Sequence, residues 1–219
     1  QAAERQSLRF GRTLEVPPRP DLAAVEMRAP RMRAPATLAH LLTDDKHERA
    51  SHSYGKSFRD KLRAFRGQFP NPPDLVALPK SEDDVRAVLE WCDGQGYVAI
   101  PYGGGSSVVG GVEPPEASNG IVTLDLREMN QVLEVDPVSR AARIQAGVLG
   151  PDLETQLRPH GFTLRHYPQS FEWSTLGGWI VTRSGGHYAT NGTHIDDFVE
   201  SVRMLTPRGP WESRRLPGS

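Results

Sequence analysis

The sequence predicts a mixed α+β fold, because short apolar runs of strand length lie between helical patterns at irregular intervals. The runs at 75–78 and 97–100 flank a helical pattern. Two strands joined by one helix form a β-α-β unit, whose strands lie parallel with a right-handed crossover. The helix is expected to begin after Ser81, because serine followed by three acidic residues suits a helix cap and the helix dipole. Gly94 and Gly96 are expected to end it.

The later elements follow from local signals of the same kind. Pro151 suits the first turn of a helix, and Gly161 suits the end of that helix. Cys92 lies on the predicted core face of the first helix, and we interpret it as a buried small hydrophobic residue. Further strands are expected at 120–125, 131–136, 141–146 and 199–205, and further helices at 151–157 and 174–182.

The composition excludes several classes of protein. The 219 residues carry 26 basic and 27 acidic side chains, and the net charge of −1 disfavours a general nucleic-acid-binding protein. No apolar run approaches the ~18 residues of a membrane span, and no secretory signal is visible. The single cysteine excludes an internal disulfide and a multi-cysteine zinc site, so we expect a cytoplasmic protein without a metal site. Because arginine far outnumbers lysine, the composition suggests a bacterial source.

Residues 1–71 are expected to form an Arg- and Pro-rich extension with short helices, ahead of a compact domain at 72–219. Two interpretations of the Pro-rich start stay open: a basic arm for a lipid surface or acidic partner, and a solvated segment that wraps on the later domain. Short helices are expected near 37–50 and 55–66. The second would place three residues on one apolar face, namely Phe58, Leu62 and Phe65.

The strongest local feature is a glycine-rich segment that directly follows the predicted strand at 97–100. After Pro101 and Tyr102 come Gly103, Gly104, Gly105, Ser106 and Ser107. Glycine lets the main chain approach a ligand closely, and consecutive N–H groups in such a bend can converge on an anion. The segment lacks the lysine of a Walker A loop, and Val108 stands where the common dinucleotide fingerprint needs glycine. A diphosphate site and an ordinary flexible turn therefore both stay open.

Two further segments combine glycine with hydroxyl side chains. In the segment at 169–179, Ser or Thr at 174–175 suits the cap of a helix with exposed N–H groups, and glycine at 177–178 indicates close main-chain contact. The alternative is an ordinary helix–helix contact. The segment at 182–187 ends in Arg-Ser-Gly-Gly-His, which looks like a covalent flavin-attachment motif. Because that motif belongs in the first glycine loop, we expect His187 to make loop hydrogen bonds instead.

Taken in order, these segments resemble the PCMH-type FAD-binding domain of the vanillyl-alcohol oxidase superfamily, and within it the alkylglycerone-phosphate synthase family. The resemblance implies two α+β subdomains with FAD between them. It also implies a domain that is incomplete at its C-terminal end, because the family continues with a further FAD-contacting segment and a substrate-cap domain. The motifs that carry the resemblance are Pro-Asp-Leu-Val at 73–76, Pro-x-Gly-Gly-Gly-x-Ser at 101–107, Ser-x-Glu-x-Ser-Thr-x-Gly-Gly-Trp at 170–179, Thr-Arg at 182–183 and Met-x-Thr-Pro-Arg-Gly at 204–209.

The resemblance implies noncovalent FAD, because Ser106 stands where covalently linked members carry histidine. It departs from the family at Gln169, where Asp is usual, and at Ser184-Gly185, where an Ala-Ser pair is usual. It implies no catalytic residue in this chain, since the groups assigned to catalysis lie later in the family's sequence. The implied cofactor-binding residues are Pro101, Tyr102, Gly103, Gly104, Gly105, Ser106, Ser107, Gln169, Ser170, Ser174, Thr175, Gly178, Thr182, Arg183, Ser184 and Gly185.

The implied reaction exchanges the acyl group of acyl-dihydroxyacetone phosphate for a long-chain alcohol, which forms an ether lipid without net redox change. Two alternatives stay open: FAD-linked oxidation of a 2-hydroxy acid such as D-lactate, and a non-catalytic flavin- or nucleotide-binding module. The expected partners are a small lipid-like substrate and the remainder of the same polypeptide. A peripheral membrane contact and a homodimer stay open as further alternatives.

Overall fold

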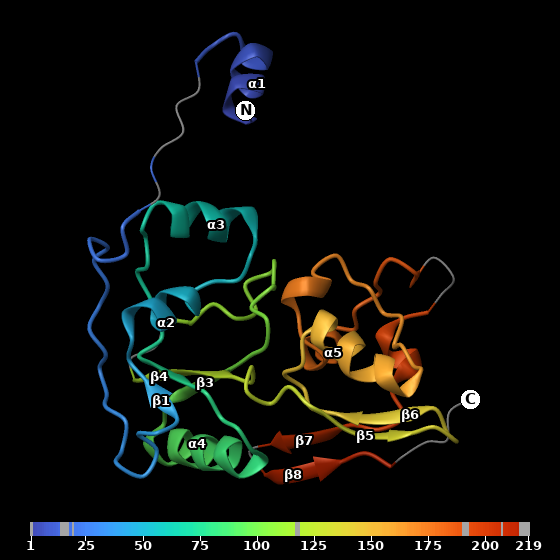
Figure 1. Cartoon of the computed structure of the whole chain (residues 1–219). Coiled ribbons are helices and arrows are strands. Elements are labelled where there is room, and N and C mark those ends of the chain that lie inside the picture. The colour runs from blue at the N-terminus through green and yellow to red at the C-terminus, as the bar shows by residue number, and fades with distance from the viewer. Residues whose placement is uncertain are drawn as a thin grey trace.

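The chain forms two bodies that lie side by side (Figure 1). The computed structural model describes residues 2–13, 18, 20–116, 119–189, 193–206 and 208–214. The first body holds residues 20–116 and the strand that follows them, and the second holds the described chain after that strand. Helix α1 (Ala2–Phe10) stands apart from both (Figure 1). Strands and helices are mixed in each body, which confirms the predicted α+β class.

The first body is built on a four-stranded sheet with the strand order β1-β2-β4-β3. Strands β2 and β3 both run parallel to β4, and the short β1 pairs antiparallel with β2. The two predicted strands are therefore parallel and joined by α4, as expected, but they do not pair with each other because β4 lies between them. The elements are β1 (Leu42–Thr43), β2 (Leu75–Ala77), α4 (Glu82–Gln95), β3 (Val98–Tyr102) and β4 (Ile121–Asp125).

Helix α4 begins and ends close to the predicted residues. The Ser81 hydroxyl accepts a hydrogen bond from the Asp84 N–H, and the Asp84 carboxylate accepts one from the Ser81 N–H, which forms a capping box. Gly96 ends the helix in the left-handed conformation with φ of 67°, whereas Gly94 lies inside the last turn. Cys92 is 2% exposed and packs in the core between α4 and the sheet, as predicted.

The chain ahead of β2 wraps on the first body and contributes to its core. The predicted helix near 37–50 is partly wrong, because Leu42–Thr43 extends into β1 and helix α2 (Lys46–Ser51) starts only after the Asp45 cap. The buried Asp74 ties the Pro-rich segment down, since its carboxylate accepts hydrogen bonds from Arg28 and Arg31. Of the two interpretations of this segment, these contacts support the wrapped one. The domain boundary at residue 72 stays a prediction.

Helix α3 (Phe58–Phe65) confirms the second predicted helix but not the packing of its apolar face. Phe58 is 84% exposed, and Leu62 and Phe65 are also exposed. The helix is instead held through its polar side, where Asp60 is buried. Among the described residues, none of the helices combines the length and hydropathy that a membrane span requires.

The second body contains two antiparallel strand pairs and a separate apolar core. The β5–β6 pair carries a bulge near Val132, and helices α5 and α6 pack beside it around Val148, Leu153 and Trp179. The strand predicted at 199–205 begins only at Arg203, and a further strand, β8, which was not predicted, follows it. Pro207 of the predicted turn lies outside the described residues. The elements are β5 (Val132–Asp136), β6 (Ala141–Ile144), α5 (Gly150–Leu157), α6 (Leu176–Val181), β7 (Arg203–Thr206) and β8 (Gly209–Glu212).

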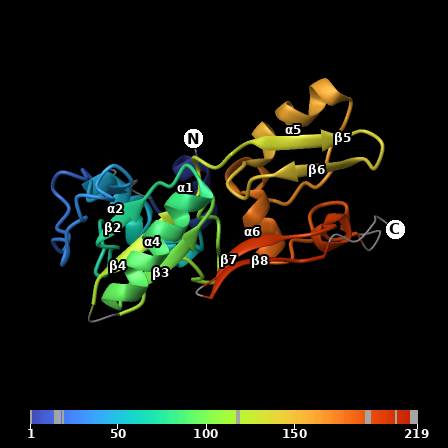
Figure 2. The ribbon, with the colours of Figure 1, turned by 90° about the horizontal axis from the view of Figure 1, so that it is seen from below.

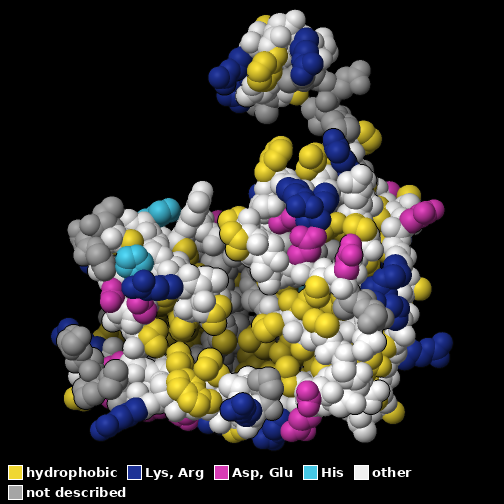
Figure 3. All heavy atoms as spheres, turned by 180° about the vertical axis from the view of Figure 1, so that it is seen from behind, with side chains coloured by type: hydrophobic (Ala, Val, Ile, Leu, Met, Phe, Trp, Pro, Cys, Tyr) yellow, Lys and Arg dark blue, Asp and Glu magenta, His cyan; other side chains and the backbone are white. Residues whose placement is uncertain are grey.

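Strands β7 and β8 bring the second body back toward the first. Figure 2 shows this strand pair running between α4 and α6. Arg203 of β7 forms an ion pair with Glu82 at the start of α4, with 2.9 Å between Nε and Oε2. Figure 3 shows hydrophobic side chains gathered where the two bodies meet. The fold therefore places an apolar junction between the two bodies.

Candidate cofactor-binding site

The glycine loop leaves the sheet at the carboxyl end of β3. Tyr102 is the last residue of that strand and pairs with Asp125, the last residue of β4. Ligands of parallel sheets bind outside the carboxyl ends of the strands, so this edge is the expected place for a cofactor. The loop residues Gly103 to Ser107 are buried or half-buried, while Pro101 is exposed.

The loop presents main-chain donors that have no protein partner. Within the described chain, the N–H groups of Gly103, Gly104, Gly105 and Ser106 donate no hydrogen bond. Ser107 behaves differently, because its hydroxyl accepts from the Gly111 N–H and its carbonyl accepts from the Lys56 N–H at 2.7 Å. A run of consecutive unpaired N–H groups is the chemistry that binds a phosphate or another anion.

The first and second predicted segments meet in the structure. A Cβ on Gly103 would overlap the Thr175 hydroxyl, and a Cβ on Gly104 would overlap the carbonyl of Trp173. At Gly104, main chain therefore lies directly against main chain, and at Gly103 it lies against the Thr175 side chain, so neither position has room for a Cβ. The glycine loop and the segment at 173–175 together form one wall of the candidate site.

Tyr102 supports the loop from below. Its ring is buried, and burial raises the pKa of its phenol to about 12. The phenol donates a hydrogen bond to the Ser51 carbonyl at 3.3 Å. A Cβ on Gly105 would overlap the Tyr102 hydroxyl, so the loop folds tightly over the ring. Tyr102 is one of the predicted cofactor-binding residues, but its side chain packs against protein.

The hydroxyls of the second segment are engaged within the protein. The Ser174 hydroxyl donates to the Ser170 carbonyl at 2.7 Å and accepts from the Trp179 indole at 2.6 Å. The Thr175 hydroxyl accepts from the Gly178 N–H and caps α6. These side chains fix the segment in place, whereas Gln169 is exposed. Any contact of Ser174 with a cofactor would therefore come from its main chain.

The third predicted segment lies at the end of α6. The Thr182 hydroxyl donates to the Gly178 carbonyl at 2.7 Å, and the Ser184 hydroxyl lies 3.1 Å from the His166 Nε2. Arg183 has a left-handed φ of 52° and pairs with Asp196. Among the described residues, no hydrogen bond or ion pair joins 182–185 to the glycine loop. The structure thus brings the first segment into contact with the second, and the third segment contacts the second but not the glycine loop.

Residues ahead of the predicted domain also hold the loop, and they are not among the predicted site residues. A Cβ on Gly55 would overlap the Ser107 carbonyl. Farther along, Arg63 of α3 makes a two-point ion pair with Glu113, at 2.6 and 2.9 Å, and so fixes the chain that follows the loop. These contacts join residues about 50 positions apart, and no local pattern in the sequence indicates them.

A bound metal has no evident ligand set in this part of the protein. Within the ranges that the structure describes, no three His, Cys, Asp or Glu side chains gather closely enough to hold a metal ion.

His187 takes part in a loop hydrogen bond through its main chain. Its main-chain N–H donates to the Tyr167 carbonyl.

Comparisons with known proteins identify relatives of this chain. A family model described as "FAD binding domain" matches residues 73–213. The alkyldihydroxyacetonephosphate synthase of Dictyostelium discoideum is 45% identical over 173 residues, which cover 79% of this chain and 28% of that protein. The synthase of the same name from Trypanosoma brucei brucei is 39% identical over 171 residues, covering 77% and 28%. The chain thus spans 28% of the length of both curated relatives.

Other relatives carry different names. The glycolate oxidase subunit GlcD of Bacillus subtilis is 34% identical over 142 residues, covering 65% of this chain and 30% of that protein. A solved structure of an alkyldihydroxyacetonephosphate synthase superposes with a TM-score of 0.86 at 40% identity, covering 90% of this chain and 38% of that one. The Dictyostelium and Trypanosoma synthases are both eukaryotic, so they give no support to a bacterial source.

Proposed function

Because this chain belongs to the family of FAD-binding domains, we propose that it holds FAD noncovalently, with the diphosphate on the main chain of residues 103–106. The observation that carries the proposal is the set of N–H groups without protein partners in Gly103 to Ser106. They stand at the carboxyl edge of a parallel sheet, against the segment at 173–175. A diphosphate would supply the acceptors that these donors lack.

Each predicted segment has its own part in this proposal. The loop at 101–107 holds the diphosphate, the main chain of 169–175 and Gly178 closes the wall beside it, and residues 182–185 approach another part of the cofactor. When bound, FAD supplies the reactive ring system, and the protein supplies binding, orientation and electrostatics. Ser106 offers no ring nitrogen for covalent attachment, which supports a noncovalent complex.

For the whole protein, we propose the alkyl-transfer activity that the name of its synthase relatives describes. The acyl group of acyl-dihydroxyacetone phosphate would be exchanged for a long-chain alcohol to form an ether lipid. The identity of 45% to one such synthase and the TM-score of 0.86 with another support this proposal. A second candidate is oxidation of a 2-hydroxy acid, because the glycolate oxidase subunit is 34% identical. No residue of this chain is assigned to catalysis.

The proposed partners follow from the same relatives. They are a small lipid-like substrate and the remainder of the polypeptide, which would supply the catalytic groups. A homodimer, a peripheral membrane contact and a cytoplasmic location belong to the proposal as well. A non-catalytic flavin- or nucleotide-binding module remains the alternative of another class.

Two measurements on the purified protein test the proposal. The first is visible flavin absorbance, followed by acid precipitation: noncovalent FAD passes into the supernatant, and flavin that stays in the pellet contradicts the noncovalent complex. The second offers acyl-dihydroxyacetone phosphate with a labelled long-chain alcohol. Label in an ether lipid supports alkyl transfer, whereas dye reduction by D-lactate without such label supports the oxidase. Bound flavin without turnover favours the module.

A further inference from the structure

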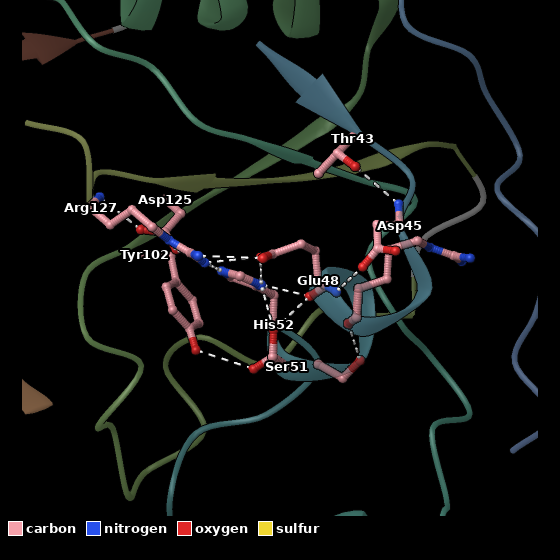
Figure 4. Close-up of polar contacts among 10 residues, drawn as sticks. Thr43, Asp45, Glu48, Ser51, His52, Tyr102, Asp125 and Arg127 are labelled. Carbon is pink, nitrogen blue, oxygen red and sulfur yellow. Dashed lines mark hydrogen bonds and ion pairs between the residues drawn. The ribbon is translucent and has the colours of Figure 1, made fainter. Parts of the chain in front are cut away.

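A cluster of charged side chains lies beneath the glycine loop (Figure 4). It joins α2, the ends of β3 and β4, and the chain just after β4. Its members make hydrogen bonds or ion pairs with one another and lie at the first body's carboxyl sheet edge. Neither the predicted site nor the proposed function uses them. They are Glu48, His52, Asp125 and Arg127, with the ring of Tyr102 beside them.

His52 is at the centre of this cluster. Its side chain is 1% exposed, with Nε2 2.8 Å from the Asp125 carboxylate and Nδ1 2.6 Å from the Glu48 carbonyl. Both of these partners accept hydrogen bonds, and the Ser51 hydroxyl also lies 3.1 Å from Nδ1. Arg127 lies 3.2 Å from Nε2 and shares the Asp125 carboxylate, and it also pairs with the Glu48 carboxylate. Two basic groups therefore face two acidic groups in a closed network.

The network reaches the glycine loop through Tyr102. The His52 and Tyr102 rings lie 4.3 Å apart between centroids, tilted by 50°. Tyr102 is the residue immediately before Gly103, and the loop folds back so that Gly105 lies against the phenol oxygen. Because packed aromatic rings in a buried site have few alternative positions, fixing the His52 ring fixes the Tyr102 ring. The ring in turn sets the shape of the loop.

The chain that carries His52 holds the loop at a second point. Three residues later, Gly55 packs against the Ser107 carbonyl, and the Lys56 N–H donates to that carbonyl at 2.7 Å. The carbonyl of Ser51, just before His52, accepts a hydrogen bond from the Tyr102 hydroxyl. The segment at 51–56 therefore holds the loop at both its beginning and its end. This segment lies ahead of residue 73, where the match to the FAD-binding domain begins.

We propose that His52 is a positioning residue for the cofactor, which arranges the loop N–H groups for a diphosphate before that diphosphate binds. The inference rests on the proposed FAD site. It adds a residue ahead of residue 73 to the cofactor site, and it assigns a role in cofactor binding to the buried charged network. Preorganised donors bind an anion more tightly than donors that must be ordered during binding.

The test compares His52→Ala, at the residue that follows α2, with His47→Ala, a change at an exposed histidine within α2 that stands outside the network. Flavin fluorescence would measure the Kd for FAD and for riboflavin, which lacks the diphosphate, in the protein stripped of cofactor. We expect His52→Ala to raise the Kd for FAD about tenfold, which corresponds to about 1.4 kcal/mol, and to leave the Kd for riboflavin within twofold. His47→Ala is expected to change neither.

Circular dichroism separates this outcome from loss of the fold. If His52→Ala does not fold, His52→Gln serves instead, because it removes the ring that packs against Tyr102 and keeps a polar side chain beside Asp125. It is expected to weaken FAD binding without weakening riboflavin binding. A folded variant with the wild-type Kd for FAD, or an equal loss for both ligands, overturns the positioning role. A wild-type protein that binds no FAD overturns the proposed function instead.

Discussion

Replacing Gly104 by alanine tests how closely the two glycine-containing segments must approach. The new Cβ would overlap the Trp173 carbonyl and lie 2.8 Å from the Ser174 Cα, where carbon atoms normally keep about 3.5 Å or more. The obstructing atoms are main chain, so they cannot turn aside as a flexible side chain would. The loop and the segment at 173–175 must therefore separate by at least about 0.7 Å.

That separation has a cost that can be expressed in affinity. Adding one methyl group to a tightly packed region typically costs about 1–3 kcal/mol. If the displaced loop is the diphosphate site, the same free energy is lost from FAD binding, and the Kd rises about 5- to 150-fold. Gly104→Asp adds a carboxylate beside the diphosphate, so it is expected to weaken binding further than Gly104→Ala does.

The assay is flavin fluorescence titration of the cofactor-free variants, with Gly111→Ala as the matched control. Gly111 follows the same loop, and its Cβ would meet only the Ser107 hydroxyl at 3.4 Å, an ordinary contact distance. The control is therefore expected to bind FAD with nearly the wild-type Kd. Wild-type affinity in folded Gly104→Ala would refute the assignment of this loop to the diphosphate.

Three further predictions concern the protein around the site. Gly94→Ala places a methyl group where no atom lies within 4 Å, inside α4, so chemical denaturation should show a gain of up to about 1 kcal/mol; a loss would contradict the open space. Asp74→Asn leaves Arg28 and Arg31 without their buried carboxylate and should cost about 3 kcal/mol. Hydrogen bonds from these arginines hold the pKa of Asp74 well below its usual range, against the opposing effect of burial. The stabilisation is therefore complete above the unfolded pKa of about 3.9 and is lost as pH falls below it, and a variant with the same acid dependence as wild type would contradict this. Burial raises the pKa of Cys92 to about 11, so a thiol reagent at pH 8 should modify it only after unfolding, and rapid reaction of the native protein would show otherwise.

The sequence allowed prediction of those elements whose signals are local. Ser81 and Asp84 form their capping box from residues three apart, and the strands β2 to β6 follow from short apolar runs, so these parts were confirmed. Strand β1 was missed because Leu42–Thr43 is extended only through its pairing with β2, more than 30 residues away. The exposure of the apolar face of α3 could not be predicted for a related reason. The spacing of apolar residues predicts an apolar face, but it does not show which part of the protein, if any, packs against that face.

Some parts of the candidate site could likewise be predicted from local sequence, and others could not. The glycine loop was visible in the sequence, and the resemblance to a family of FAD-binding domains is confirmed by the comparisons. The residues that support the loop could not be predicted, because Gly55 and His52 contact Ser107 and Tyr102 from about 50 positions upstream, and Arg63 holds Glu113 just after the loop from a similar separation. The cofactor-binding assignments of individual residues stay predictions, and Ser174 and Tyr102 show why. A residue in a motif can serve the fold of the loop rather than touch the ligand.

A crystal structure of the protein with FAD would show directly whether the main chain of the glycine loop binds the diphosphate. Diphosphate oxygens are expected about 2.7–3.2 Å from the main-chain nitrogens of Gly103, Gly104, Gly105 and Ser106. A diphosphate bound elsewhere, with those N–H groups still lacking an acceptor or paired with protein, would contradict this expectation.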